Sequence, residues 1–322
     1  MEKRMIKKAC CLVFGGALLW LLPSIGMSQC NVTSSGGYSG NSIQDAINSA
    51  TSPVQISVTG TCAENLLINE SKDYLCLSVP NGDTATIQGT DSTKPTITII
   101  GRGITIGRLI NSTNLQGNLT IKGNYDGIQV IRGGTAFIEY ITIEETGRNG
   151  IVVAMNSFAH IVGSSIQNNP VDGIVADTGS LVRIGIRTTA DSTARPNIIQ
   201  GNANGVTVVR SATAQVVGNT IQNNSSDGVR VLRVSQADIS NNTINGNGRY
   251  GILVTQNSGV NLGRDTGDTI FDSPNTTTVG NSVKGLSCSI GGYADGRLGT
   301  LNGVGKHNAT EFTKDCIDSL IP

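Results

Sequence analysis

The stretch GVRVLRVSQADISNNTINGNGRY, residues 228–250, decides the fold of this chain. It opens with Gly228 and a short β-branched run, continues with a second alternating run, and ends where Gly251 opens the next copy 23 residues later. A fixed period in the low twenties, built from short strands and polar turns, is typical of a solenoid. The sequence therefore predicts one elongated repeat body.

The same unit recurs along the middle of the chain. Its first glycines, called anchor glycines below, stand 23, 23, 32, 23 and 23 residues apart: Gly127, Gly150, Gly173, Gly205, Gly228 and Gly251. Positions one, three, nine and eleven beyond each anchor are aliphatic, and an isoleucine lies seven residues before the next. Because strand side chains alternate between faces, these positions point inward from three short strands per coil. We expect an all-β parallel β-helix whose coils of about 23 residues lie about 4.8 Å apart.

The composition agrees with a solenoid of small side chains. The 322 residues include 41 glycines, only 14% are charged and 4% are aromatic, and the formal net charge is zero. Such a chain builds its core from stacked aliphatic side chains. The balanced charge favours neither a nucleic-acid partner nor a charged membrane surface. We expect a monomer.

Residues 1–28 resemble a secretory signal peptide. Four Lys or Arg residues among the first eight precede the largely apolar stretch from Ala9 to Leu22, and small residues follow at Gly26 and Ser28. The apolar stretch is shorter than the roughly 20 residues of a membrane-spanning helix. We therefore expect a secreted, periplasmic or cell-surface protein without a transmembrane anchor after cleavage.

The cysteines fit an oxidising compartment. We predict disulfides between Cys30 and Cys62 and between Cys288 and Cys316, one at each end of the solenoid, and a buried thiol at Cys76. Only two histidines and no C-x-x-C motif occur, which disfavours a Cys/His metal site. We expect no cofactor, with calcium as the alternative. Lipid attachment to Cys30 is disfavoured, because the residue directly before it is Gln29 and not a small residue.

The ends of the solenoid need covers. Residues 42–50, SIQDAINSA, predict a short amphipathic helix with a Ser-x-x-Asp start, placed to cap the first coil. We divide the chain into an N-terminal cap at 29–60, a parallel β-helix at 61–290 and a C-terminal cap or tail at 291–322.

This helix motif, followed by Gly-Ile-x-Val coils, resembles the right-handed parallel β-helix proteins of the pectin-lyase-like superfamily. The resemblance covers nearly the whole chain after residue 28 and implies a right-handed β-helix. It implies little about activity, because that superfamily includes lyases, hydrolases, epimerases, esterases and adhesins. The Asn-Thr-Asp, Asp-Asp, Gly-His-Gly, Asp-Pro-His and Arg-x-Pro-x-x-Arg motifs of enzymes in that superfamily are absent from this sequence.

Two coils are longer than the others, and their extra segments both begin twelve residues beyond the anchor, at Gly185 and Gly263. They should leave from the same side, about 14 Å apart, and wall a trough floored by positions ten and twelve of the coils between them. Its candidate floor residues are Gln215, Val217, Asp238 and Ser240, flanked by Arg183 and Asn261. The candidate loop residues are Arg187, Asp191, Arg195, Arg264, Asp265 and Asp268. A row of such polar groups suits the many hydroxyls of a saccharide, whereas the alternative is that the loops are plain insertions with solvated charges.

Three further features have ordinary explanations. The Asp and Asn residues before the anchors are interpreted as turn residues next to glycines with positive φ. Arg132, Arg210 and Arg233, five residues beyond their anchors, are interpreted as a solubilising surface, with binding of an acidic sugar as the alternative. His160 has no acidic partner evident in the sequence and is expected to be a lone surface histidine.

Three functions remain open. The first is an exported, non-catalytic β-helix that binds a polysaccharide or cell-envelope glycan. The second is a polysaccharide lyase or related carbohydrate-active enzyme, with Arg183 or Arg195 as base and Asp238 near a calcium ion. The third is a structural or protein-binding solenoid, in which Val152 and Val175 belong to an exposed apolar patch.

Overall fold

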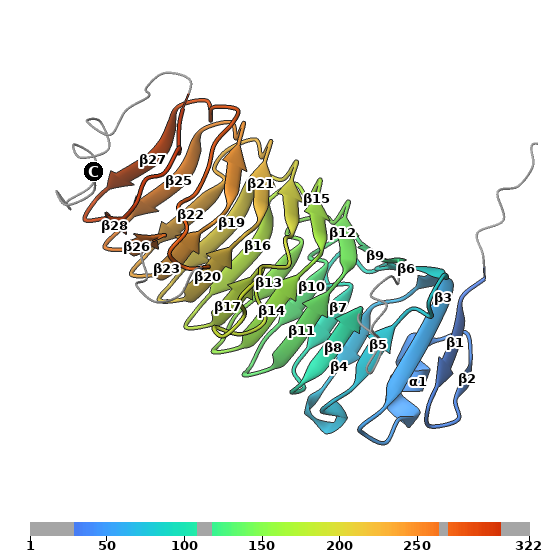
Figure 1. Cartoon of the computed structure of the whole chain (residues 1–322). Coiled ribbons are helices and arrows are strands. Elements are labelled where there is room, and N and C mark those ends of the chain that lie inside the picture. The colour runs from blue at the N-terminus through green and yellow to red at the C-terminus, as the bar shows by residue number, and fades with distance from the viewer. Residues whose placement is uncertain (1–28, 108–117, 264–269, 304–322) are drawn as a thin grey trace, which may run out of the picture.

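The computed structural model describes residues 29–107, 118–263 and 270–303. The chain is a parallel β-helix in which short strands stack into three columns along an elongated solenoid (Figure 1). We number the columns in the order in which one coil passes through them after its anchor glycine. Each strand pairs in register with its equivalent in the neighbouring coils, as the repeat predicted.

Stack 1 contains the strands that follow the anchors. They are β4 (Leu66–Ile68), β7 (Ile97–Ile99), β10 (Ile128–Val130), β13 (Ile151–Val153), β16 (Asp172–Asp177), β19 (Asn204–Val209), β22 (Val229–Leu232), β25 (Tyr250–Thr255) and β27 (Lys284–Ser289).

Stack 2 contains the second strand of each coil. Its members are β5 (Cys76–Ser78), β8 (Ile104–Gly107), β11 (Thr135–Glu139), β14 (Phe158–Val162), β17 (Leu181–Ile184), β20 (Thr213–Val217), β23 (Gln236–Ser240), β26 (Gly259–Leu262) and β28 (Tyr293–Gly296).

Stack 3 completes the coil. It contains β6 (Thr84–Gln88), β9 (Asn118–Lys122), β12 (Ile141–Glu144), β15 (Ser165–Gln167), β18 (Ile198–Gln200), β21 (Thr220–Gln222) and β24 (Thr243–Asn245). The long strand β3 (Gln55–Ala63) pairs with both β5 and β6 and so begins stacks 2 and 3 together.

The N-terminal end is closed by a small cap. The helix α1 (Ile43–Ser49) begins after Ser42, whose hydroxyl accepts a hydrogen bond from the Asp45 N–H, as the capping motif predicted. Its apolar face is buried, and the antiparallel strands β1 (Asn31–Ser34) and β2 (Ser39–Gly40) lie beside it and β3 (Figure 1). A short 3₁₀ turn, η1 (Glu70–Lys72), follows β4.

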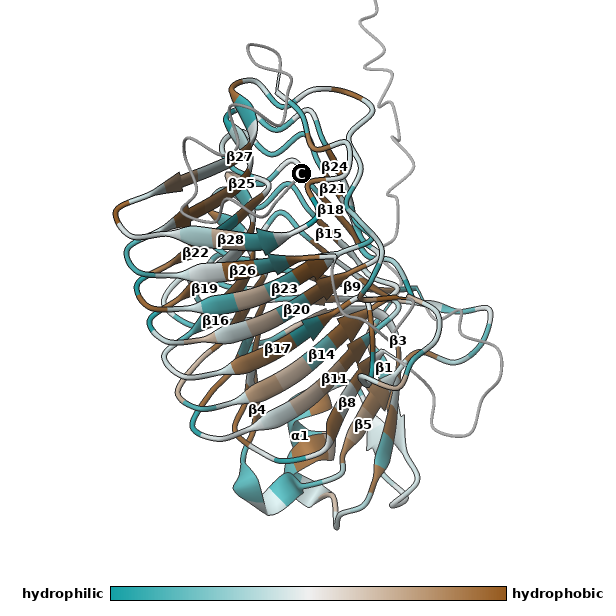
Figure 2. Ribbon diagram, turned by 60° about the vertical axis from the view of Figure 1, so that its left-hand side comes forward, coloured by the Kyte–Doolittle hydropathy of each residue, from teal (hydrophilic) through white to brown (hydrophobic). Residues whose placement is uncertain are grey.

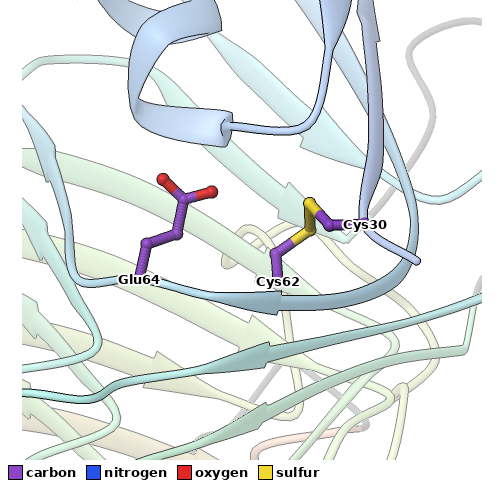
Figure 3. Close-up of side chains that lie close together, drawn as sticks. All are labelled: Cys30, Cys62 and Glu64. Atoms are coloured by element: carbon purple, nitrogen blue, oxygen red, sulfur yellow. A yellow bond between two sulfur atoms is a disulfide. The ribbon is translucent and has the colours of Figure 1, made fainter. Parts of the chain in front are cut away.

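The predicted disulfide between Cys30 and Cys62 is present and ties β3 to the residue before β1 (Figure 3). Cys76 is fully buried in β5. Residues 1–28 and Cys316, and with them the signal peptide and the second predicted disulfide partner, lie outside the described residues. Within those residues, no helix is long and apolar enough to cross a membrane. The domain boundaries stay predictions.

With one exception, the predicted inward positions form one continuous aliphatic core along the solenoid. The exception is Ile198 in the first long coil: it is 44% exposed, and Ile199 takes the inward position that pairs with Ile166. The anchor glycines, however, do not have the positive φ that we predicted from the Asp-Gly and Asn-Gly pairs. They are needed for close approach: a Cβ on Gly205 would lie 2.5 Å from the carbonyl oxygen of Gly228 in the next coil. Positive φ instead occurs five residues beyond the anchors, in the turn between stacks 1 and 2, for example at Arg210 (56°) and Arg233 (58°).

Buried asparagine ladders bind the turns of successive coils together. At the turn between stacks 3 and 1, each side chain accepts from the backbone and side-chain amides of the one before it. The ladder consists of Asn169, Asn202, Asn224, Asn247 and Asn281. A second, unpredicted ladder occupies the turn between stacks 2 and 3: Asn197, Asn219, Asn242 and Asn275.

The residues immediately before the anchors form a third buried ladder. Asn149 donates to Asp126, Asn204 donates to Asp172, and the Asp227 N–H donates to Asn204. The Asp and Asn residues before the anchors therefore do form a row at a turn. Their role is to join successive coils by hydrogen bonds, and not to precede glycines with positive φ.

Candidate functional site

The outer face of stack 2 carries a row of polar side chains in direct register, and Figure 2 shows the strands of this face side by side. Arg183 on β17 lies opposite Gln215 on β20, which lies opposite Asp238 on β23, which lies opposite Asn261 on β26. All four are partly exposed. The phase of the repeat thus placed the position-ten residues correctly, and the row continues to Asp295 on β28, which the sequence analysis did not include.

The predicted position-twelve floor is not exposed, which corrects the trough as we drew it. Val217 is fully buried and Ser240 is 1% exposed. A second small hydrophobic cluster joins Val217 to Ile186 from one long loop and to Ile270 and Phe271 from the segment that follows the other. The loop segments therefore meet over the intervening coils instead of flanking an open channel, and only position ten remains accessible.

The charged residues of the first long loop pair with one another or with stack 2. Arg187 donates two hydrogen bonds to the carboxylate of Glu139 on β11, at 2.8 and 2.6 Å. Arg195 forms an ion pair with Asp191 at 2.9 Å, and Asp191 also accepts from the Arg187 N–H. These groups hold the loop in place. Residues Arg264, Asp265 and Asp268 of the second loop lie outside the described residues.

His160 is not the lone surface histidine that we predicted. It is 7% exposed, and its Nε2 lies 2.7 Å from Glu139 Oε1. Burial alone raises the pKa of the Glu139 carboxyl, but hydrogen bonds and charge from His160 and Arg187 outweigh burial and hold that pKa below its ordinary value. Glu139 escaped the sequence analysis because it sits at position twelve of the preceding coil, diagonal to His160.

An aromatic residue adjoins the polar row. The ring of Tyr293 on β28, which is 41% exposed, lies over Gly259 on β26, and its hydroxyl donates to Gln236 Oε1 at 3.1 Å. A Cβ on Gly259 would lie 2.2 Å from the ring, so only glycine lets the ring lie there. Together with Asp238, Asn261 and Asp295, these groups line a hollow of about 230 Å³. The unusual glycine in β26 is the sequence signal that could have revealed it.

Arg183 forms the other end of the accessible row. Its Nε donates to Gln215 Oε1 at 3.0 Å, its Nη1 donates to the Arg187 carbonyl at 3.3 Å, and its guanidinium lies 5.4 Å from the centroid of the Phe158 ring. These contacts fix a planar cation beside planar amides, an arrangement that offers hydrogen-bond donors at fixed positions.

One group of potential metal ligands occurs among the described residues: Cys30, Cys62 and Glu64 (Figure 3). The two sulfurs form the disulfide and provide no thiolate, which is the form that binds metals. The Glu64 carboxylate already accepts from the Ser42 hydroxyl and from the first N–H groups of α1. These residues therefore serve the cap and do not suit a metal ion.

Residues 180–290 match the family described as the right handed beta helix region. No curated protein and no solved structure gives a significant match. The matched segment begins just before β17 and ends just after β27, and so contains Arg183, Gln215, Asp238 and Asn261. The match and the stacked parallel strands agree on a right-handed parallel β-helix.

Proposed function

We propose that this right-handed β-helix protein is exported and binds carbohydrate, without catalysis, on the outer face of stack 2. The observation that carries the proposal is the exposed ring of Tyr293, which lies against Gly259 beside the row of Asp238, Asn261 and Asp295. An aromatic face packs against the C–H face of a sugar ring, while carboxylate and amide groups accept and donate to its hydroxyls.

The regular spacing of the row supports an extended ligand. From Arg183 to Asp295 the row crosses five neighbouring strands, which corresponds to about 19 Å at about 4.8 Å per strand. A chain of sugar units lying along the solenoid axis would meet a polar side chain at every step. Rigid strands also hold these groups in place before binding, which reduces the entropy that the protein loses on binding.

Export agrees with the disulfide at the N-terminal end and with the signal-like residues 1–28. Calcium binding stays a separate proposal: the Asp238 carboxylate and the amide carbonyl of the neighbouring Asn261 are oxygen ligands of the kind that calcium uses. The lyase alternative has less support, because both arginines considered as its base donate to fixed partners: Arg183 to Gln215, and Arg195 to Asp191.

Isothermal calorimetry with neutral and acidic oligosaccharides, with and without calcium, tests the proposal. Tyr293→Ala and Asp238→Asn should each weaken binding by about tenfold or more, since each removes a ring contact or a charge-assisted hydrogen bond. Tyr74→Ala is the matched control, because Tyr74 is also exposed and lies against a glycine, Gly103, far from the hollow. Equal binding by all three variants would refute this site.

A further inference from the structure

The outer face of stack 1 holds a second and larger hollow. It crosses five coils at β10, β13, β16, β19 and β22 and has a volume of about 440 Å³. Its length, about 19 Å along the axis, suits an extended ligand, and its volume lies within the usual range of ligand pockets. We call it the stack-1 groove.

The floor of the groove is mixed. Its apolar members are Val152, Val175, Val209 and Leu232, and polar side chains of Gln129, Thr207 and Arg230 lie among them. Val175 and Val209 are only 8% and 6% exposed. The structural or protein-binding alternative placed Val152 and Val175 in an exposed apolar patch, and this placement is wrong. These valines form the bottom of a groove that longer charged side chains border.

Most charges of the groove are paired inside it. Arg230 bonds to the Asp172 carboxylate at 3.1 Å and to the Thr207 hydroxyl at 2.8 Å. Arg210 pairs with Asp177 at 2.5 Å. At the N-terminal end, Asp126 accepts from Gln129 and Asn149, while Arg148 donates to the Tyr125 hydroxyl.

Arg233 differs from these residues. It is exposed at the rim, one coil beyond Arg210, and within the described part of the chain its guanidinium has no hydrogen-bond or ion-pair partner. The lining contains four arginines (148, 210, 230 and 233) and three aspartates (126, 172 and 177), a surplus of one positive charge. A ligand with a carboxylate near Arg233 would neutralise that surplus and accept two parallel hydrogen bonds from the guanidinium.

From these observations we propose that the stack-1 groove binds an extended peptide segment of a protein partner, with apolar side chains and one acidic residue placed at Arg233. Side chains of an extended peptide alternate, so one set contacts the valine floor while its backbone groups meet Gln129, Thr207 and Arg230. About six residues span the groove at about 3.3 Å each. A saccharide chain lacks the apolar side chains that this floor accommodates, and a polyanion carries more charge than a surplus of one balances.

The test uses fluorescence anisotropy with the purified protein and a set of seven-residue peptides. The peptides alternate valine or leucine with threonine, carry an uncharged fluorophore and an amidated end, and place one aspartate at each threonine position in turn. Each has a counterpart with asparagine in place of aspartate. At least one aspartate peptide should bind about tenfold or more tightly than its asparagine counterpart, because its carboxylate gains charge-assisted hydrogen bonds.

Two variants and a matched control connect this difference to the groove. Arg233→Gln should abolish the preference for aspartate, whereas Val152→Thr, a change of nearly equal volume, should weaken the aspartate and asparagine peptides alike. Arg132→Gln should change neither affinity. Arg132 has the same position in its coil and the same positive φ as Arg233, but it lies outside the groove.

Any of the following results would overturn the proposal. No peptide of the set binds with a dissociation constant below about 1 mM, the aspartate and asparagine peptides bind with equal affinity, or the Arg233→Gln variant keeps the preference for aspartate. Trigalacturonate, added as competitor, should not displace the peptide at equal concentration. Its stronger, Arg233-dependent binding would assign the groove to acidic sugars instead. Because the polar row lies on stack 2, loss of carbohydrate binding there leaves this result unaffected.

Discussion

Removal of one asparagine side chain from the ladder between stacks 3 and 1 should destabilise the solenoid strongly, because it breaks buried hydrogen bonds to both neighbouring coils. Asn224 is 1% exposed, and its side-chain amide makes four hydrogen bonds. Its Oδ1 accepts from the backbone N–H and the Nδ2 of Asn202, both at 3.1 Å, and its Nδ2 donates to Asn247 Oδ1 at 2.9 Å and to the Ile199 carbonyl at 3.3 Å.

In Asn224→Ala, the Asn202 N–H loses its acceptor in a buried site, and three further groups each lose one hydrogen bond. A buried donor without a partner costs about 1–3 kcal/mol, and each other lost bond about 1 kcal/mol. We expect a loss of about 4–6 kcal/mol in the free energy of unfolding. Asn224→Asp keeps the acceptor oxygens but loses the donors and buries a charge, so it should be no less destabilising at neutral pH.

The assay is urea denaturation followed by circular dichroism, with native-state hydrogen exchange to locate the opened coils. Gln222→Ala is the control, because Gln222 lies in the same coil and donates to Gln200 at 2.9 Å from a partly exposed position. That variant should lose less than about 1 kcal/mol. If Asn224→Ala and Gln222→Ala have equal midpoints and equal exchange in neighbouring coils, the ladder does not stabilise the fold and our reasoning is wrong.

Three further predictions concern pH and packing. The folded pKa of Glu139 lies below its ordinary value of 4.5, so its stabilising contribution is complete above pH 4.5 and is lost as pH falls through the folded value. Glu139→Gln should therefore lower the free energy of unfolding at pH 7 and make that free energy depend less on pH in the acid range. Acid denaturation followed by circular dichroism measures both effects. Burial raises the pKa of Asp227 despite the nearby Arg249 charge, so ionisation of the Asp227 carboxyl opposes folding as pH rises. Asp227→Asn should therefore raise the melting temperature at pH 7 by a few degrees, and this gain should vanish near pH 3. Gly205→Ala should lower the free energy of unfolding, measured by urea denaturation, by about 2 kcal/mol or more, because the new Cβ would lie 2.5 Å from a carbonyl oxygen. A variant as stable as the parent would show that the coils can separate to admit the Cβ.

The repeat could be predicted because each coil contacts only its neighbours, so a pattern of 23 residues contains most of the packing information. Ile166 and Ile221, assigned to the core from their distance to the next anchor glycine, are fully buried. The same rule was wrong by one residue for Ile198, which follows the first insertion. The same local logic placed Gln215, Asp238 and Asn261 in one row. The anchor glycines were found by their spacing, although the reason for them, close approach of two backbones, appears only when coils are stacked.

Contacts that leave this local pattern could not be predicted. Val217 is covered because Ile186 and Phe271, 85 residues apart in the chain, meet over it. Nothing in the period indicates that two insertions touch. Arg187 reaches Glu139 across 48 residues for the same reason. The unpredicted Asn219 and Asn242 did have a local signal, since both stand fourteen residues beyond their anchor glycines.

The measurement that tests the central claim most directly follows binding and turnover together. The purified protein is titrated with acidic and neutral polysaccharides in the presence of calcium, while absorbance near ~235 nm reports any unsaturated uronate formed by base-catalysed elimination. We predict binding that Tyr293→Ala weakens by about tenfold or more and that Tyr74→Ala leaves unchanged, with no rise in absorbance. A rise in absorbance that depends on Arg183, Arg195 or Asp238 would make the protein a lyase. Binding that is as tight in Tyr293→Ala as in the parent protein would contradict the assigned site.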